Sequence, residues 1–199
     1  ADIVKFQCGW RDGAGELNEL SEDKLFQLKE WAEYFQIELM FSVFHDKAFE
    51  MVKQLGLNYY KIASRTVADN APLVEKVLDE NKTTFVSLGF WEQDGFPFER
   101  RENLEYLWCR SIYPTRPVDL TNFPKAFNGD TWSGYSDHSI GIDTALIAIC
   151  RGAEIVEKHF TLDKSDTTIR DHALSATPEE FSLLTQLGKE IFRKISLGV

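Results

Sequence analysis

The chain has 199 residues, 43% of them hydrophobic, and a formal net charge of -10 at pH 7. That length and composition allow one substantial core, so we expect a single domain over residues 1–199. The acidic balance, without any basic patch, argues against binding to nucleic acid or to an anionic membrane surface. Three cysteines without a CxxC pair, no apolar run of about 20 residues and no signal-peptide pattern together predict a cytoplasmic protein.

Short β-rich runs alternate along the chain with longer stretches of helical periodicity. The predicted strands are residues 3–7, 38–42, 59–63, 84–88, 105–109, 132–135 and 154–159. Three predicted helices begin directly after Ser21, at Asp46 and directly after Asn70. Two more cover residues 143–151 and 178–197. This strict alternation predicts parallel strands joined by crossovers, hence either an open doubly wound sheet or a barrel.

The sequence contains neither the nucleotide fingerprint GxGxxG nor the phosphate loop GxxxxGK(S/T), which removes the usual reason for choosing an open sheet. We therefore predict an α/β fold of the TIM-type (β/α) barrel. Such a barrel has eight strands, so this one is expected to be abbreviated or truncated, with the missing strand upstream of Ala1. Gly89, Gly95 and Pro97 interrupt residues 89–103, and this predicts that one crossover is shortened to a loop.

Polar side chains close several of the predicted strands, at the end where TIM barrels place their active sites. Lys5 and Gln7 share one face of their strand, and Lys61 stands in a later strand with Ser64 just after it. A lysine inside a barrel is costly unless it meets an anion, so these positions predict an anion-binding site. The alternative is that each lysine pairs with a buried carboxylate or extends to solvent.

Two histidines, His138 and His159, end neighbouring predicted strands at corresponding positions. Such a pair can hold an exchangeable divalent ion, Mn²⁺ or Mg²⁺, with water and substrate oxygen completing the coordination. The alternative is that each histidine is a hydrogen-bonded structural residue. Asp137 and Asp171 are candidates for orienting a histidine or binding a sugar hydroxyl, although a loop aspartate also commonly caps a helix or a turn.

Four segments carry a resemblance to a known family: KIAS at 61–64, IYP at 112–114, GYSDHSIG at 134–141 and GAEIVEKHFTL at 152–162. They resemble the sialic acid (N-acetylneuraminate) synthase family, and the likeness runs from residue 3 to about residue 181. The resemblance implies a barrel that condenses phosphoenolpyruvate with an N-acetylated hexosamine, either N-acetylmannosamine or a related sugar. The implied products are a nine-carbon 2-keto sugar acid and phosphate, formed with metal assistance.

The same resemblance assigns roles to residues by their place in the motifs. It implies that phosphoenolpyruvate is bound by Lys5, Lys61, Ser64, Ser87 and Ser136, the metal by His138 and His159, and the sugar by Gln7, Tyr113 and Asp171. Lys61, His138 and His159 would be the catalytic residues. The implied partners are phosphoenolpyruvate and an acetamido sugar, and a homodimer is compatible with the resemblance.

The sequence departs from the family pattern in several places. The family's first strand, with its catalytic glutamate, and its C-terminal antifreeze-like domain have no counterpart here. Thr66 replaces an expected acidic residue, Val43 an expected small polar residue and Ser111 an expected asparagine. Three hypotheses stay open: a phosphoenolpyruvate-dependent sugar-acid synthase, which we favour; a degenerate barrel that binds phosphoenolpyruvate or metal without turnover, or partners a complete synthase; and an aldolase or other keto-acid synthase.

Overall fold

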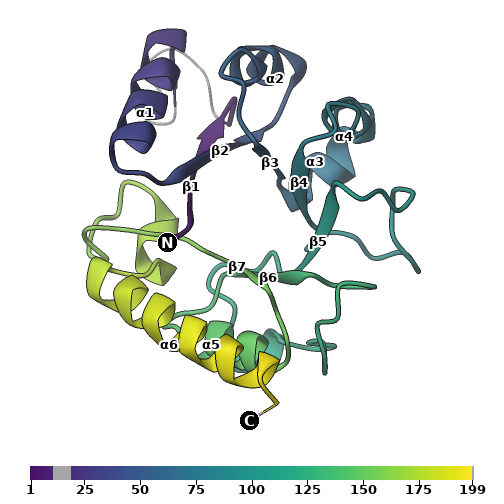
Figure 1. Cartoon of the computed structure of the whole chain (residues 1–199), viewed down its shortest axis with the longest axis vertical. Helices are drawn as coiled ribbons and strands as arrows, with labels where there is room; N and C mark the ends of the chain where they lie inside the picture. The colour runs from purple at the N-terminus through teal and green to yellow at the C-terminus, as the bar shows by residue number, and fades with distance from the viewer. Residues whose placement is uncertain (11–18, 199) are drawn as a thin grey trace. The chain divides into compact units, whose positions relative to one another are not determined.

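A computed structural model describes residues 1–10 and 19–198 of the chain (Figure 1). The contacts divide the chain into two compact units. The first comprises residues 1–86 and 90–104, and the second comprises residues 87–89 and 105–199. That the two units form one domain stays a prediction.

The first unit consists of parallel strands that alternate with helices. Its strands are β1 (Ile3–Cys8), β2 (Glu38–Val43), β3 (Tyr59–Ile62) and most of β4 (Thr83–Ser87), paired in chain order. Its helices are α1 (Glu22–Tyr34), α2 (Asp46–Lys53), α3 (Ser64–Asp69) and α4 (Ala71–Leu78). The predicted strands of this unit are confirmed to within one residue at each end.

Three of the four helices begin where the sequence predicts. The Ser21 and Asn70 side chains cap α1 and α4. His45 precedes Asp46 and caps α2, because its Nδ1 accepts a hydrogen bond from the Ala48 N–H at 3.1 Å. The sequence pattern does not predict α3, since six residues are too few to show a helical period.

Alternation along the strands separates an apolar face from a polar one in the first unit. Phe41 and Ile62 are fully buried on the face that the helices cover. Tyr60 lies on the same face, and its ring packs edge-on against that of Phe49 in α2, with the ring centroids 5.7 Å apart. Burial of such side chains supplies the main stabilisation of the unit. The opposite face of the same strands carries the polar residues of the candidate site.

The connection from β4 to β5 contains no helix anywhere in its residues 88–103, all of which are described. This confirms the predicted shortening of one crossover to a loop. Arg101 anchors the second half of the loop to α4, with Nη1 2.7 Å from Asp79 Oδ1 and Nη2 2.5 Å from Glu75 Oε2. Phe98 is buried, whereas residues 92–95 are exposed. The loop is therefore anchored at its end and open to solvent at its tip.

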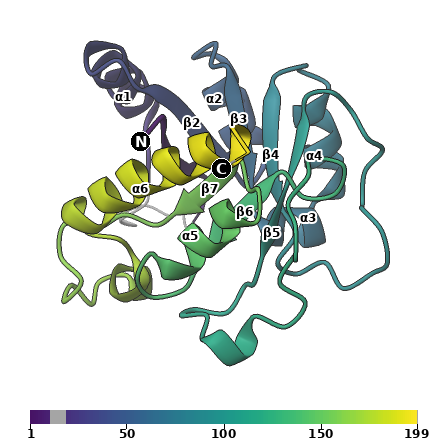
Figure 2. The same ribbon diagram turned by 60° about the horizontal axis from the view of Figure 1, so that its bottom comes forward.

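The second unit continues the same pattern. Its strands are β5 (Leu104–Cys109), β6 (Gly134–Asp137) and β7 (Ile155–Lys158), paired in chain order. Its helices are α5 (Asp143–Cys150) and α6 (Pro178–Ser196), with short 3-10 turns η1 (Pro117–Asp119) and η2 (Arg170–Leu174). Helix α6 lies along α5, with Ala145, Ile149 and Leu184 buried in the same cluster (Figure 2).

The prediction for the sixth strand was wrong by two residues. The predicted run 132–135 counts Trp132 as strand, because aromatic residues favour strands. The observed strand begins only at Gly134. A Cβ at this position would collide with the main chain of Ile155, so glycine permits the close approach of β6 and β7. The other strands and helices predicted in this unit are confirmed to within one residue.

Parallel strands that alternate with helices in both units confirm the predicted α/β class. Within residues 1–10 and 19–198, no helix is both long enough and apolar enough to cross a bilayer.

Candidate functional site

The polar face of the first unit brings predicted site residues into register. Gln7 pairs with Ser42, and Ser42 pairs with Lys61, across β1, β2 and β3. Lys5 lies two residues before Gln7 and shares its face. Lys61 is only 2% exposed, and its Nζ donates to the Ile62 carbonyl at 2.8 Å. The common face predicted for Lys5 and Gln7 is confirmed, and Lys61 joins it.

Two departures from the family pattern lie beside this face. Val43 is fully buried on the helix-covered side, because its side chain alternates with that of Ser42. Thr66 is also buried, and its hydroxyl donates to the Val43 carbonyl at 3.4 Å. Ser64 opens α3 directly after β3, at the same strand end as Lys61. Val43 and Thr66 therefore pack against one another at the end of β2, and they do not interrupt the polar face that carries Gln7, Ser42 and Lys61.

The second unit places the two predicted metal-binding histidines side by side. Asp137 of β6 and Lys158 of β7 are register partners, so the next residues, His138 and His159, are neighbours. Their ring centroids are 5.4 Å apart. His138 is 6% exposed and His159 is about one-quarter exposed. The expectation that both imidazoles stand at the same level is confirmed.

A main-chain hydrogen bond fixes the tautomer of His138. Its Nδ1 lies 2.9 Å from the Arg110 carbonyl oxygen, which can only accept, so Nδ1 carries the proton. The lone pair of the neutral ring is therefore on Nε2, as in histidines that bind metals. Burial disfavours the charged ring, but Cys109, the Arg110 carbonyl and Glu157 favour it more, and together they raise the pKa of His138.

Two residues expected to contact the sugar lie next to the histidine pair, one beside each imidazole. The Tyr113 ring lies 4.2 Å from the His138 ring, and Asp171 Oδ2 lies 3.9 Å from His159 Nδ1. Burial, reinforced by the nearby Cys109 and Asp171, raises the pKa of Tyr113 and keeps it a neutral phenol. Four of the predicted site residues thus form one group in the second unit.

Arg170 joins the same group, although its sequence position predicts no role for it. Its guanidinium lies 4.6 Å from the Tyr113 ring centre, and its Nε lies 3.3 Å from Asp171 Oδ1. The side chain is 73% exposed. Arg170 therefore orients two of the predicted sugar ligands from the solvent side.

Ser136 lies on the same face as the histidines but already has a partner. Its hydroxyl donates to Glu157 Oε2 at 2.7 Å, and the two residues are register partners on β6 and β7. Glu157 lies in the segment GAEIVEKHFTL, but no functional role was predicted for it. The sequence does offer one indication of a role for Glu157: it stands two residues before His159, and this spacing places both side chains on the same face of the strand. Ser136 is thus fixed by a carboxylate.

Ser87 and Ser111 belong to this unit as well. Ser87 ends β4 and is 2% exposed. The Ser111 hydroxyl fills the space that a Cβ would need at Gly89. Ser111 thus packs against the main chain of Gly89, at the position where the family pattern has the larger asparagine.

The residues fit a divalent ion that is held mainly by water and substrate. Among the described residues, no group of three histidine, cysteine or acidic side chains is placed to hold a metal. His138 and His159 supply two imidazoles, and the unprotonated Nε2 of His138 has the lone pair that a metal ligand needs. A two-ligand site leaves positions open for exchangeable oxygen ligands.

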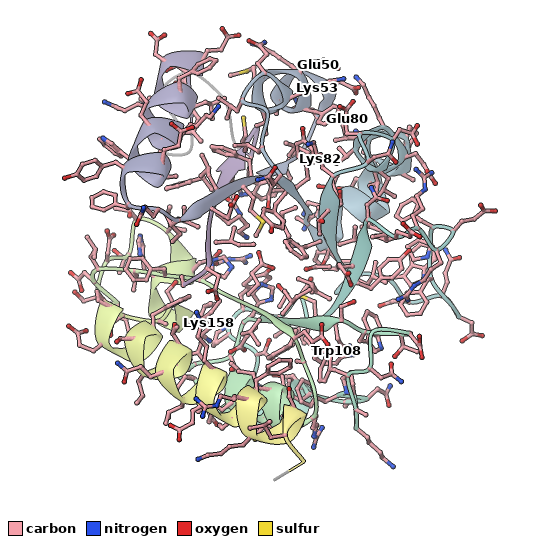
Figure 3. The ribbon with its side chains drawn as sticks, viewed as in Figure 1. Glu50, Lys53, Glu80, Lys82, Trp108 and Lys158 are labelled. Carbon is pink, nitrogen blue, oxygen red and sulfur yellow. The ribbon has the colours of Figure 1, made fainter. Side chains whose placement is uncertain are left out.

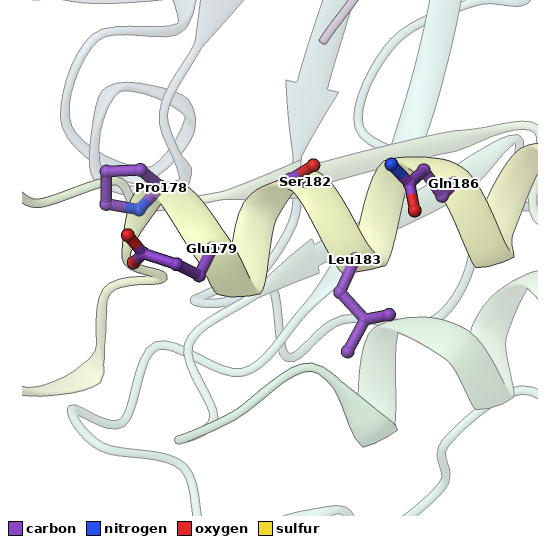
Figure 4. Close-up of a pocket in the computed structure, with 5 residues that line it drawn as sticks. All are labelled: Pro178, Glu179, Ser182, Leu183 and Gln186. Atoms are coloured by element: carbon purple, nitrogen blue, oxygen red, sulfur yellow. The ribbon is translucent and has the colours of Figure 1, made fainter.

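A hollow on α6 offers different chemistry. It has a volume of about 440 Å³ and is lined by Pro178, Glu179, Ser182, Leu183 and Gln186 (Figure 4). Its lining has one carboxylate and no cation, so it does not suit phosphoenolpyruvate. The strand ends, and not this hollow, carry the groups expected of an active site.

Parallel strands joined by helical crossovers place the chain in the class of TIM-type (β/α) barrels, with lysine and serine side chains at strand ends of the first unit and histidine side chains at strand ends of the second. The chain belongs to the NeuB family, whose family model matches residues 14–198. A sialic acid synthetase from Leptospira borgpetersenii, solved with citrate, has a similar structure with a TM-score of 0.78 at 25% identity. The similarity covers 98% of this chain and 74% of that one.

Two relatives show the same kinship in sequence. N-acetylneuraminate-9-phosphate synthase of Drosophila melanogaster is 31% identical over 84% of this chain and 47% of its own length. N,N'-diacetyllegionaminic acid synthase of Campylobacter jejuni is 30% identical over 82% of this chain and 52% of its own length. The chain therefore spans about half the length of these relatives.

Proposed function

We propose that this chain condenses phosphoenolpyruvate with an N-acetylated hexosamine to give a nine-carbon 2-keto sugar acid and phosphate. The observation that carries the proposal is the group of His138, His159, Tyr113 and Asp171 at the strand ends of the second unit. Membership of a family that contains sialic and legionaminic acid synthases supports it. Those relatives are named for different products, so the proposed substrate is a class of sugar, the N-acetylated hexosamines.

Phosphoenolpyruvate is an anion with a phosphate and a carboxylate, and it needs cations and hydroxyl donors. Lys5, Lys61 and Ser64 are its proposed ligands in the first unit. Lys61 is the strongest candidate, because a buried ammonium interacts with an anion at a lower effective dielectric than a solvated one. Ser87 and Ser136 are the proposed hydroxyl ligands in the second unit.

Gln7, Tyr113 and Asp171 are the proposed contacts to the acetamido sugar. As a neutral phenol, Tyr113 can donate a hydrogen bond to a sugar oxygen, and Asp171 can accept one from a sugar hydroxyl. His138 and His159 would hold Mn²⁺ or Mg²⁺, which as a Lewis acid would polarise the sugar aldehyde. These residues would align the aldehyde carbon with the enol carbon that attacks it, and water addition at C2 would then release phosphate.

The direct test is phosphate release from phosphoenolpyruvate with Mn²⁺ and a panel of 2-acetamido sugars, followed by mass spectrometry of the products. We expect release that depends on the sugar and a nine-carbon keto acid that carries its carbons. His138→Ala is the control and should lose activity. A product with another carbon count would instead indicate another keto-acid synthase, and the same product formed from pyruvate without phosphate release would indicate an aldolase.

The role of Lys61 has a separate test. Lys61→Met keeps the length of the side chain but removes its charge, and the loss of one charge-assisted contact costs about 1.5–3 kcal/mol. We therefore expect phosphoenolpyruvate to bind roughly ten- to a hundredfold more weakly. Lys53→Met is the matched control, since Lys53 is half exposed and pairs with Glu80 at 2.6 Å on the surface of the same unit (Figure 3). Equal affinity in both variants would remove Lys61 from the site.

A second function, binding without turnover, follows from one observation. Thr66 stands where the family pattern has an acidic residue, and its hydroxyl is bonded to the Val43 carbonyl. If phosphoenolpyruvate or Mn²⁺ binds but no phosphate is released with any sugar, this alternative replaces the synthase. We propose a cytoplasmic location in either case, since Cys8, Cys109 and Cys150 form no disulfide in the described structure.

A further inference from the structure

A buried ion pair lies behind the two histidines, on the opposite face of the same strands. Lys158, which is labelled in Figure 3, has its Nζ 2.9 Å from Asp137 Oδ2, and both side chains are fully buried. Lys158 also donates to the Ser139 carbonyl. The pair lies on the helix-covered face, because Asp137 shares its face of β6 with Tyr135, which packs with Ala148 of α5.

The second oxygen of Asp137 is equally well satisfied. Oδ1 accepts from the Tyr135 hydroxyl at 2.9 Å and from both the N–H and the hydroxyl of Ser139 at 2.7 Å. A buried charge is tolerated when it is paired and its remaining positions are hydrogen-bonded. The network therefore fixes the chain on both sides of His138, at residues 137 and 139.

The register connects this network to the histidines. Asp137 and Lys158 are Cα partners, and His138 and His159 directly follow them. Because side chains alternate, the ion pair ties the two strand ends together on one face while the imidazoles stand on the other. A further hydrogen bond, from Thr115 N–H to the His138 carbonyl at 2.9 Å, holds the same peptide.

We propose that Asp137 and Lys158 are positioning residues that set the separation and orientation of His138 and His159. The inference rests on the proposed function of that histidine pair. A purely structural role predicts a different outcome, because buried ion pairs can often be replaced by uncharged residues of similar volume without loss of stability. Positioning predicts that such a replacement preserves the fold but disturbs the imidazoles.

The decisive variant is the double substitution Asp137→Asn with Lys158→Met in the full chain. The asparagine side chain retains an oxygen that can accept from Tyr135 and Ser139, and methionine keeps the approximate length of the lysine stem. We expect a thermal midpoint within about 5 °C of wild type. Mn²⁺ affinity, measured by electron paramagnetic resonance, should fall about tenfold or more, as for other residues that orient metal ligands. In the metal-free protein, the ¹⁵N imidazole signals of His138 should shift.

The matched control removes an exposed ion pair from the same unit. Glu190→Gln with Lys194→Met breaks a pair on α6 with a distance of 2.9 Å, and it should leave both Mn²⁺ affinity and the imidazole signals as in wild type. If the Asp137–Lys158 double variant has no cooperative unfolding transition, Asp137→Asn alone takes its place under the same criteria. Wild-type Mn²⁺ affinity together with unshifted imidazole signals in the folded variant would overturn the proposal.

His138→Ala separates this inference from the proposed function. If His138→Ala binds Mn²⁺ as tightly as wild type, the metal site itself is wrong, and the imidazole signals of the double variant decide the positioning role. If His138→Ala loses Mn²⁺ but the double variant keeps it with unshifted signals, the metal site stands and only the positioning role fails.

Discussion

Gly134→Ala would test the close approach of β6 and β7 that places the histidines together. A Cβ at this position would lie 2.7 Å from both the carbonyl carbon and the Cβ of Ile155, and closer still to the carbonyl oxygen. Carbon atoms normally pack about 3.5–4.0 Å apart, so the strands must separate by roughly 1 Å. Overpacking typically costs about 1–3 kcal/mol, and we expect the upper value because main-chain atoms cannot rotate away.

Thermal and urea unfolding, followed by circular dichroism, would measure this cost. A loss of about 3 kcal/mol corresponds to a fall in Tm of roughly 6–12 °C for a chain of this size. Gly188→Ala in α6 is the matched control, since its Cβ would meet only the movable end of the Ile149 side chain at 2.8 Å. Alanine also favours the helix by about 1 kcal/mol, so this variant should be nearly neutral. A Gly134→Ala protein as stable as the control would refute the described approach of the two strands.

Three further predictions follow from the same geometry. Mn²⁺ affinity should rise with pH through the titration of His138, because the metal takes the neutral ring and the raised pKa places that transition above the ordinary histidine value; a pH-independent affinity would contradict this. Arg170→Ala should raise KM for the sugar about three- to tenfold and leave KM for phosphoenolpyruvate unchanged, as measured by steady-state kinetics, since it removes the stacking on Tyr113. Thr177→Ala should destabilise the protein by about 1 kcal/mol in urea unfolding, because it breaks the capping box of α6, while an unchanged midpoint would show that the cap contributes nothing.

The sequence predicts the parts of the fold that depend on local pattern. Alternation in β1 places Lys5 and Gln7 on one face, and the structure has them there. Capping side chains such as Ser21 and Asn70 mark helix starts because their bonds are local. The start of β6 was misplaced because strand preference at Trp132 says nothing about which main-chain atoms the strand must approach.

The sequence predicts the candidate site where positions correspond between neighbouring strands. His138 and His159 end consecutive strands, and parallel pairing brings them together. Arg170 was missed because its role depends on how η2 approaches Tyr113, which no spacing reveals. The Asp137–Lys158 pair was missed for a related reason: the partner of a buried charge depends on register across residues far apart in the chain.

The loop that replaces a helix between β4 and β5 has a practical use. Its exposed residues 92–95 are followed by the buried Phe98 and by Arg101, which is bound to α4. Exposed loop tips tolerate insertions best, because few contacts are broken there. A short affinity tag or a fluorescent reporter inserted after Gln93 should therefore leave the anchored half in place. The protein could then be immobilised or labelled at an internal position, with both chain ends left unmodified.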